Sequence, residues 1–322
     1  MRLRDVQCEV IVLFYKWSGR VDEYAKGKRI HQIIENVKVD QLEKTLEKSF
    51  GIVGFTCDEG VRRNQGRVGA KKAPNEIRKF LANIAYHPNK ENIIDIGNIT
   101  CIDEKLEEAQ EKLGRTVARL IEYNYTPIIL GGGHETFYGH YLGVRKALGK
   151  DKMIGMINLD AHFDLRIDSI PSSGTMFRQI LETDPHANYL CLGIQELANT
   201  EQLFLTAKKY GVEYLLATEL EPLENTFAKI KAFSQKHDVM IYTICTDVMN
   251  QAIAPGVSAP NPFGLAAETV RAITKHVVTQ ENFLSIDVSE VNPNYDVEHM
   301  TARFISYMIG EVLHLLNKNE GR

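Results

Sequence analysis

Three residues that could bind a metal ion stand two positions apart in the sequence. Asp160, His162 and Asp164 directly follow a largely apolar run at residues 156–159. In extended chain this spacing points all three side chains to one side. Two carboxylates and an imidazole converging at a strand end suit Mn²⁺ or Zn²⁺. Any one of them alone could belong to a polar loop, but three in register favour a metal site.

Further polar residues stand at or near the ends of other apolar runs. His134 follows three glycines, Cys245 and Asp247 share one side of a second run, and Glu290 ends a third. Asp247 has no basic neighbour in its run, and a buried carboxylate needs a partner such as a metal ion. Cys245, taken singly, is more typical of a small buried side chain than of a ligand. Glu290 could hold a cationic substrate nitrogen or cap the following helix.

The elements that carry these residues predict an α/β fold. Short apolar runs alternate with amphipathic stretches such as 103–123 and 268–276, and the runs lie at 50–55, 127–130, 153–159, 189–194, 212–217, 239–247 and 284–291. Runs that are apolar nearly throughout indicate strands buried on both faces of a parallel sheet. We therefore expect one doubly wound, mostly parallel sheet with helices on both faces. Such sheets bind ligands at the carboxyl ends of their strands, which is where the polar residues fall.

Length and composition favour one globular domain. No linker divides the 322 residues, so we expect a polar N-terminal extension, residues 1–48, packed on a domain formed by residues 49–322. The net charge of −4 gives no reason to expect nucleic acid or an anionic membrane as partner. Five scattered cysteines without CxxC spacing (Cys8, Cys57, Cys101, Cys191 and Cys245) suit a reducing compartment, and no run is long enough to span a bilayer. The expected location is cytoplasmic.

The four strand-end segments, taken in order, resemble the arginase/agmatinase family of ureohydrolases. The matching segments are Gly-Gly-Gly-His at 131–134, Asp-Ala-His-Phe-Asp at 160–164, residues 243–247 with Ala-Pro-Gly at 254–256, and Glu-Val-Asn-Pro at 290–293. The match spans residues 50–315. It implies a single three-layer domain with a sheet of about eight strands.

The resemblance also implies a binuclear Mn²⁺ site. Its ligands would be His134, Asp160, His162, Asp164, Cys245 and Asp247, with Asp160 shared between the ions. The family has a bridging Asp where this chain has Cys245, and a thiolate prefers softer metals than Mn²⁺. Two ions per subunit are expected, with the second left open by this cysteine. The implied mechanism is attack on an amidine carbon by a hydroxide that bridges the metals, with Asp164 relaying a proton and Glu290 holding the substrate.

Within the family the chain is most similar to the branch that hydrolyses N-formimidoyl-L-glutamate to L-glutamate and formamide. The segments 63–70, 160–166, 172–178 and 254–260 carry that closer match. A dicarboxylate substrate requires cationic and donor groups, and the candidates are Asn64, Arg67, Ser173, Thr175 and Arg178.

Two alternatives remain at this stage. One is a ureohydrolase acting on a guanidino compound, although Phe177 occupies the position of the arginase acid/base histidine. His140 is a conceivable substitute, but we expect it on an outward helix face. The other alternative is a non-catalytic scaffold of the same fold. Relatives commonly assemble, so a homo-oligomer is expected.

Overall fold

One large parallel sheet organises the molecule. The computed structural model describes residues 14–22, 27–47, 49–87 and 92–318. Within them nine strands pair in the order β2-β5-β3-β6-β11-β10-β7-β8-β9, and every neighbouring pair is parallel. The strands are β2 (Glu35–Asn36), β3 (Ser49–Thr56), β5 (Ile93–Thr100), β6 (Tyr125–Leu130), β7 (Ile154–Leu159), β8 (Ala187–Ile194), β9 (Glu213–Leu216), β10 (Val239–Cys245) and β11 (Phe283–Ser289). The predicted α/β class is confirmed, with one more strand than expected.

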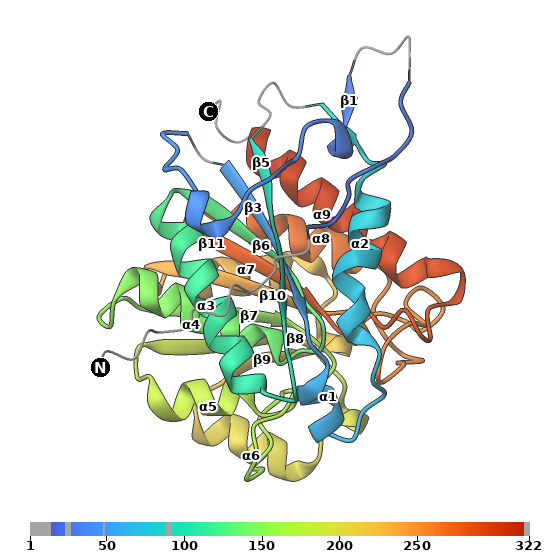
Figure 1. The fold of residues 1–322 in the computed structure, drawn as a ribbon. Helices are drawn as coiled ribbons and strands as arrows, with labels where there is room; N and C mark the ends of the chain where they lie inside the picture. The colour runs from blue at the N-terminus through green and yellow to red at the C-terminus, as the bar shows by residue number, and fades with distance from the viewer. Residues whose placement is uncertain (1–13, 23–26, 48, 88–91, 319–322) are drawn as a thin grey trace.

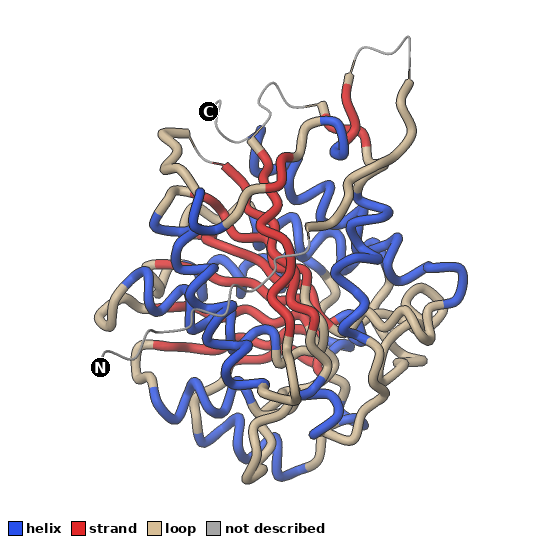
Figure 2. Tube along the Cα trace, viewed as in Figure 1, coloured by secondary structure: helices blue, strands red, loops and turns tan. Residues whose placement is uncertain are grey.

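Helices cover both faces of this sheet, as Figures 1 and 2 show. One face is packed by α2 (Ala73–Leu81), α7 (Leu223–Ser234), α8 (Ala267–Val278) and α9 (Met300–Lys318). The other is packed by α3 (Leu106–Glu122), α4 (Thr136–Leu148), α5 (Met176–Thr183) and α6 (Glu201–Lys209). Parallel strands need such crossover connections, so the strand–helix alternation of the sequence leads directly to three layers.

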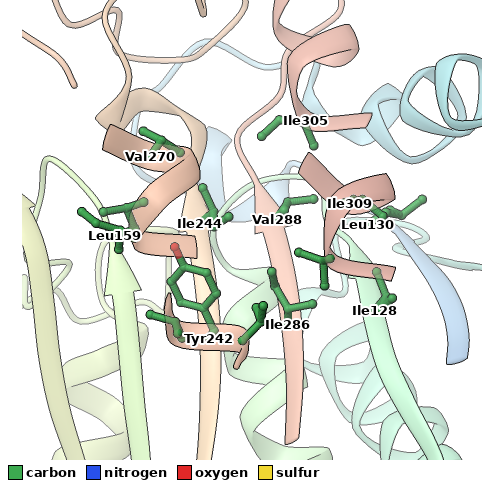
Figure 3. Close-up of a cluster of buried hydrophobic side chains, with 14 of the residues drawn as sticks. Ile128, Leu130, Leu159, Tyr242, Ile244, Val270, Ile286, Val288, Ile305 and Ile309 are labelled. Carbon is green, nitrogen blue, oxygen red and sulfur yellow. The ribbon is translucent and has the colours of Figure 1, made fainter. Parts of the chain in front are cut away.

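The core beneath α8 and α9 holds the central strands firmly. Ile244 and Val288 of β10 and β11 point toward Val270 of α8 and Ile305 of α9, and all four are buried (Figure 3). Burying an aliphatic side chain of this size contributes about 1.5–3 kcal/mol. The central strands are therefore a rigid base for the residues at their carboxyl ends.

The described part of the N-terminal extension packs against the domain. Its strand β2 pairs with β5 at the sheet edge, β1 (Lys28–Arg29) pairs with β4 (Ala85–Tyr86), and the Trp17 indole donates to Asp95 at 2.9 Å. The boundary at residue 48 stays a prediction. Cys8 lies outside the described residues, and the other four cysteines are free. No helix in the described ranges is long and apolar enough to cross a membrane.

Candidate functional site

Four adjacent strands bring the predicted site residues together. The order β6-β11-β10-β7 places side by side the strands that lead to His134, Glu290, Asp247 and Asp160. Strands β6 and β7 follow one another in the sequence. The later strands β10 and β11 lie between them in the sheet. Since all four are parallel, their carboxyl ends meet at one edge of the sheet.

The three glycines after β6 let the backbone fit between two other strand ends. A Cβ on Gly132 would lie 1.7 Å from the carbonyl oxygen of Cys57, so no side chain is accommodated there. The Glu290 amide donates to the Gly132 carbonyl at 2.8 Å. This close approach fixes His134 beside Glu290, whose Oε1 accepts the His134 backbone N–H at 2.9 Å.

Asp160 lies between two histidines and faces one with each carboxylate oxygen. Its Oδ2 is 3.1 Å from His134 Nδ1, and its Oδ1 is 3.5 Å from His162 Nδ1. His134 Nδ1 also contacts Asp164 Oδ2 at 2.8 Å, and His162 Nδ1 contacts Asp247 Oδ2 at 3.3 Å. The arrangement is two histidine–carboxylate groups that share one fully buried carboxylate.

The charges of this cluster compensate one another only in part. Burial lowers the pKa of His134, but its contacts with Asp160 and Asp164 outweigh burial and hold the pKa well above its ordinary value. His162 behaves likewise: burial opposes, while Asp247 and Asp160 raise its pKa. Burial and the charge of Asp160 raise the pKa of Asp164 to about 6. The surrounding carboxylates thus favour positive charge at both histidines, and a bound cation would also supply positive charge there.

The same residues fit a pair of metal ions. Ligand atoms of His134, Asp160 and Cys245 lie within 4.8 Å of one another, and so do those of Asp160, His162 and Asp247. Two buried oxygens, Asp247 Oδ1 and Glu290 Oε2, have no hydrogen-bond partner in the described chain. Buried carboxylate oxygens need a compensating partner, and a divalent cation or cationic ligand supplies one.

Cys245 lies inside the cluster, in surroundings that disfavour its thiolate form. It is 2% exposed, and burial together with the charges of Asp160 and Asp247 keeps its pKa well above the ordinary value. A thiol contributes no negative charge. The group that contains His134 therefore has one fewer anionic donor than an aspartate at position 245 would give.

A pocket of about 240 Å³ opens onto the cluster. Of the residues that we predicted as metal ligands, His134, His162, Asp164, Cys245 and Asp247 line it, whereas Asp160 lies behind them. Glu290 also lines the pocket, and its backbone is in the left-handed region with φ 69°. A non-glycine residue in that conformation costs about 1 kcal/mol or more and is typical of functional sites. Burial and nearby carboxylates raise the pKa of Glu290.

Only some of the predicted substrate-binding residues reach this pocket. Asn64 and Ser173 line it and are hydrogen-bonded to each other at 3.2 Å, whereas Arg67, Thr175 and Arg178 are absent from its lining. Thr175 accepts the backbone N–H of Ser172, so its hydroxyl stabilises a turn.

The two predicted arginines have other partners. Arg67 donates to the backbone carbonyls of Val257 and Ser258 and stacks on Tyr295. Arg178 binds both carboxylate oxygens of Glu182 at 2.8 and 2.9 Å. Within the described residues, Arg166 is the one arginine or lysine in the pocket lining. Arg166 stands two residues after Asp164, and this closeness to the metal-binding segment is the sequence signal that could have identified it.

His140 differs from expectation, and Phe177 lies away from the pocket. His140 is fully buried, not on an outward helix face, because its ring is hydrogen-bonded to Asp287 at 2.7 Å and Ser285 at 2.6 Å. Phe177 is buried outside the pocket lining and packs its ring 5.9 Å from that of His134. Neither side chain lies in the pocket, so neither is a proton donor to a ligand there.

Comparison with known proteins gives consistent matches over nearly the whole chain. The arginase family model matches residues 48–314. A formimidoylglutamase from Geobacillus sp. (strain WCH70) is 48% identical over 304 residues, which cover 92% of this chain and 94% of that one. The crystal structure of formimidoylglutamase from Bacillus subtilis subsp. subtilis str. 168 matches with a TM-score of 0.81 at 22% identity, covering 93% and 94% of the two chains. Formiminoglutamase from Trypanosoma cruzi, crystallised with Mn²⁺₂, matches with a TM-score of 0.76 at 25% identity, covering 87% and 98%.

Proposed function

Because this chain belongs to the arginase family, we propose that it hydrolyses N-formimidoyl-L-glutamate to L-glutamate and formamide with two Mn²⁺ ions. The observation that carries the proposal is the combination of charges around one pocket. Carboxylates and histidines form its floor, the buried Glu290 stands beside them, and the exposed Arg166 also lines it. The substrate has a matching pattern, with a cationic amidine at one end and two carboxylates at the other.

The metal ligands that we propose fall into two groups that share Asp160. His134, Asp164 and Cys245 would hold one ion, and His162 and Asp247 the other. Two bound Mn²⁺ ions would lower the pKa of a coordinated water, so that hydroxide is available near neutral pH. The chain's own task is to hold these donors in place, and Asn158 contributes by donating to Asp160 at 3.0 Å.

Glu290 and Asp164 are the residues we propose to act on the substrate. The unpartnered Oε2 of Glu290 would accept from the cationic imino nitrogen and hold the amidine carbon in line for attack by water. Asp164, which lines the pocket beside His134, would take the proton released from water and return it to the departing glutamate nitrogen. The carbon–nitrogen bond to glutamate breaks, and formamide keeps the imino nitrogen.

One assay tests this substrate against the alternatives. Purified protein with and without Mn²⁺ should release formamide and glutamate from N-formimidoyl-L-glutamate only when the metal is present. Predominant urea release from arginine, agmatine or guanidinobutyrate would instead favour another ureohydrolase. A protein that binds Mn²⁺ but hydrolyses none of these compounds would contradict the proposed activity. Assembly into a homo-oligomer stays a prediction, which sedimentation would test.

Arg166 is the residue that we expect to select for a carboxylate-bearing substrate. A charge-assisted hydrogen bond contributes about 1.5–3 kcal/mol, so Arg166→Met should raise KM by roughly 10- to 150-fold. Since the contact exists in both ground and transition states, kcat should change little. Steady-state kinetics with N-formimidoyl-L-glutamate provide the measurement.

Arg178→Met is the matched control, because its guanidinium is already paired with Glu182. It should raise KM by less than Arg166→Met does. A larger effect at Arg178 would contradict the assignment to Arg166.

Cys245 provides a test of the metal site itself. Cys245→Asp adds an anionic oxygen donor, which Mn²⁺ prefers to a thiol, so the weaker Mn²⁺ should bind about 10-fold more tightly. Activity at limiting Mn²⁺ should be at least that of the wild type. Titration with Mn²⁺ followed by metal analysis measures both quantities.

The control is Cys245→Ser, which removes the sulfur without adding charge and should not tighten binding. If Cys245→Asp folds normally but is less active at saturating Mn²⁺, the thiol has a role of its own.

A further inference from the structure

A chain of buried polar side chains runs from His134 away from the pocket. Thr243 of β10 and Asp287 of β11 are direct neighbours in the sheet. The Thr243 hydroxyl lies 3.0 Å from His134 Nε2 and donates to Asp287 Oδ1 at 2.7 Å. His140 of α4 reaches the other oxygen of the same carboxylate, Asp287 Oδ2, at 2.7 Å. None of these four residues is more than 1% exposed.

This polar strip departs from the apolar pattern of the two central strands. Ser285, Asp287 and Ser289 alternate along β11 and face α4, whereas Ile286 and Val288 face α8 and α9. Ser289 also donates to Asp287 Oδ1, at 3.1 Å. A buried carboxylate is expensive unless its oxygens are satisfied, and here both have donors. Neither the pocket nor the contacts with substrate described above make use of this strip.

The single hydrogen of the Thr243 hydroxyl determines which nitrogen of the His134 ring carries a hydrogen. A hydroxyl has a single hydrogen, and that of Thr243 is donated to Asp287. Toward His134 the hydroxyl oxygen can therefore only accept, so Nε2 must carry a hydrogen. The ring is left with Nδ1 facing Asp160 at 3.1 Å and Asp164 at 2.8 Å, on the side where the first group of metal ligands lies.

We infer that Thr243 and Asp287, anchored by His140, are positioning residues that fix the ring orientation and tautomer of His134 for metal binding through Nδ1. The inference rests on the proposed metal site but not on the proposed substrate. His140 acts through Asp287 and touches neither the pocket nor the metal ligands directly. Hydrogen-bonded partners of a metal-binding histidine typically change metal affinity by about 10- to 100-fold when they are removed.

Thr243→Val tests the inference with a nearly isosteric change. It should weaken one of the two Mn²⁺ equilibria by about 10- to 100-fold and leave the other within about threefold, because the ligands around His162 are untouched. Thr243→Ser, which keeps the hydroxyl, should retain the wild-type affinity. Binding is followed by Mn²⁺ titration without substrate, by electron paramagnetic resonance of the free ion.

Two further variants separate positioning from packing. Thr274→Val removes another buried threonine hydroxyl, one bonded to Tyr242 on the other face of the sheet, and should not change Mn²⁺ binding. His140→Gln should weaken the same equilibrium as Thr243→Val but add little in the double variant, because both act through one chain.

The outcomes distinguish this inference from the proposed function. Equal Mn²⁺ affinities for wild type and Thr243→Val would overturn the positioning role alone, as would full additivity of the two substitutions. A wild-type protein that binds no Mn²⁺ would overturn the metal site and the inference with it. A protein that binds Mn²⁺ as expected but rejects N-formimidoyl-L-glutamate would overturn only the substrate.

Discussion

Replacing Asp160 by asparagine is expected to abolish binding of both Mn²⁺ ions, not of one. Asp160 presents one oxygen toward His134 and the other toward His162, so it belongs to both ligand groups. An amide carries no negative charge, and its nitrogen would point at one of the two positions. Metal ions typically supply several kcal/mol of transition-state stabilisation, so activity should fall by about 10³-fold or more. Metal analysis and kcat/KM measure the two effects separately.

The matched control for this change is Asp184→Asn. The Asp184 side chain is 15% exposed, whereas Asp160 is fully buried, and Asp184 pairs with Arg145 and Tyr141 away from the cluster. It should retain two Mn²⁺ ions and near-wild-type activity. If the Asp160→Asn protein still binds two ions and stays active, this carboxylate is not shared between them. If it keeps both ions but loses activity, Asp160 has a role in the chemistry instead.

The location of the site could be predicted because its residues follow apolar runs directly. Asp160 and Glu290 are each the first residue after a buried strand, so their place at the sheet edge follows from the order of residues alone. What the local pattern does not contain is that β10 and β11 insert between β6 and β7. That order brings His134 next to Glu290, 156 residues away, whereas the sequence predicted only that both residues lie at the same edge of the sheet.

Polar residues inside strands account for most of what the sequence did not reveal. Strand β5 contains Asp95, Gly97 and Asn98, which hide its apolar character, and Asp95 is satisfied by the fully buried Arg78. His140 has a helical position with no local sign of its partner, because Asp287 lies on a strand 147 residues later. Local periodicity does not reveal such pairs, since each member is an exception to the pattern around it.

The sequence alone does not decide which arginine reaches the pocket, for a related reason. Arg67, Arg166 and Arg178 are equivalent as charges in the sequence, and only three-dimensional contacts separate them. Arg178 is paired by Glu182, four residues on in the same helix, which the sequence could have indicated. Arg67 is held by backbone carbonyls at 257–258, 190 and 191 residues later, and the sequence gives no sign of that contact.

Glu290→Gln is expected to impair catalysis while leaving Mn²⁺ binding intact. Glutamine can keep the acceptor that receives the His134 backbone N–H, but it replaces the unpartnered Oε2 by an amide NH₂ group, which donates and cannot accept from a cationic nitrogen. A hydrogen bond to a charged group contributes about 1.5–3 kcal/mol, so kcat/KM should fall by roughly 10- to 150-fold. Kinetics at saturating Mn²⁺, together with metal analysis, measure the two properties.

Glu135→Gln is the control that separates the effect of contact with the pocket from the effect of changing a buried glutamate. Glu135 is a second fully buried glutamate beside His134, also with an unpartnered Oε2, and burial raises its pKa to about 7. It accepts the Gly60 backbone N–H at 3.0 Å and does not line the pocket. Its replacement should change kcat/KM by much less than that of Glu290. If Glu290→Gln loses Mn²⁺ together with activity, Glu290 supports the metal site and does not hold the substrate. If both variants lose activity equally at full metal occupancy, the defect comes from the buried charge and not from contact with the amidine.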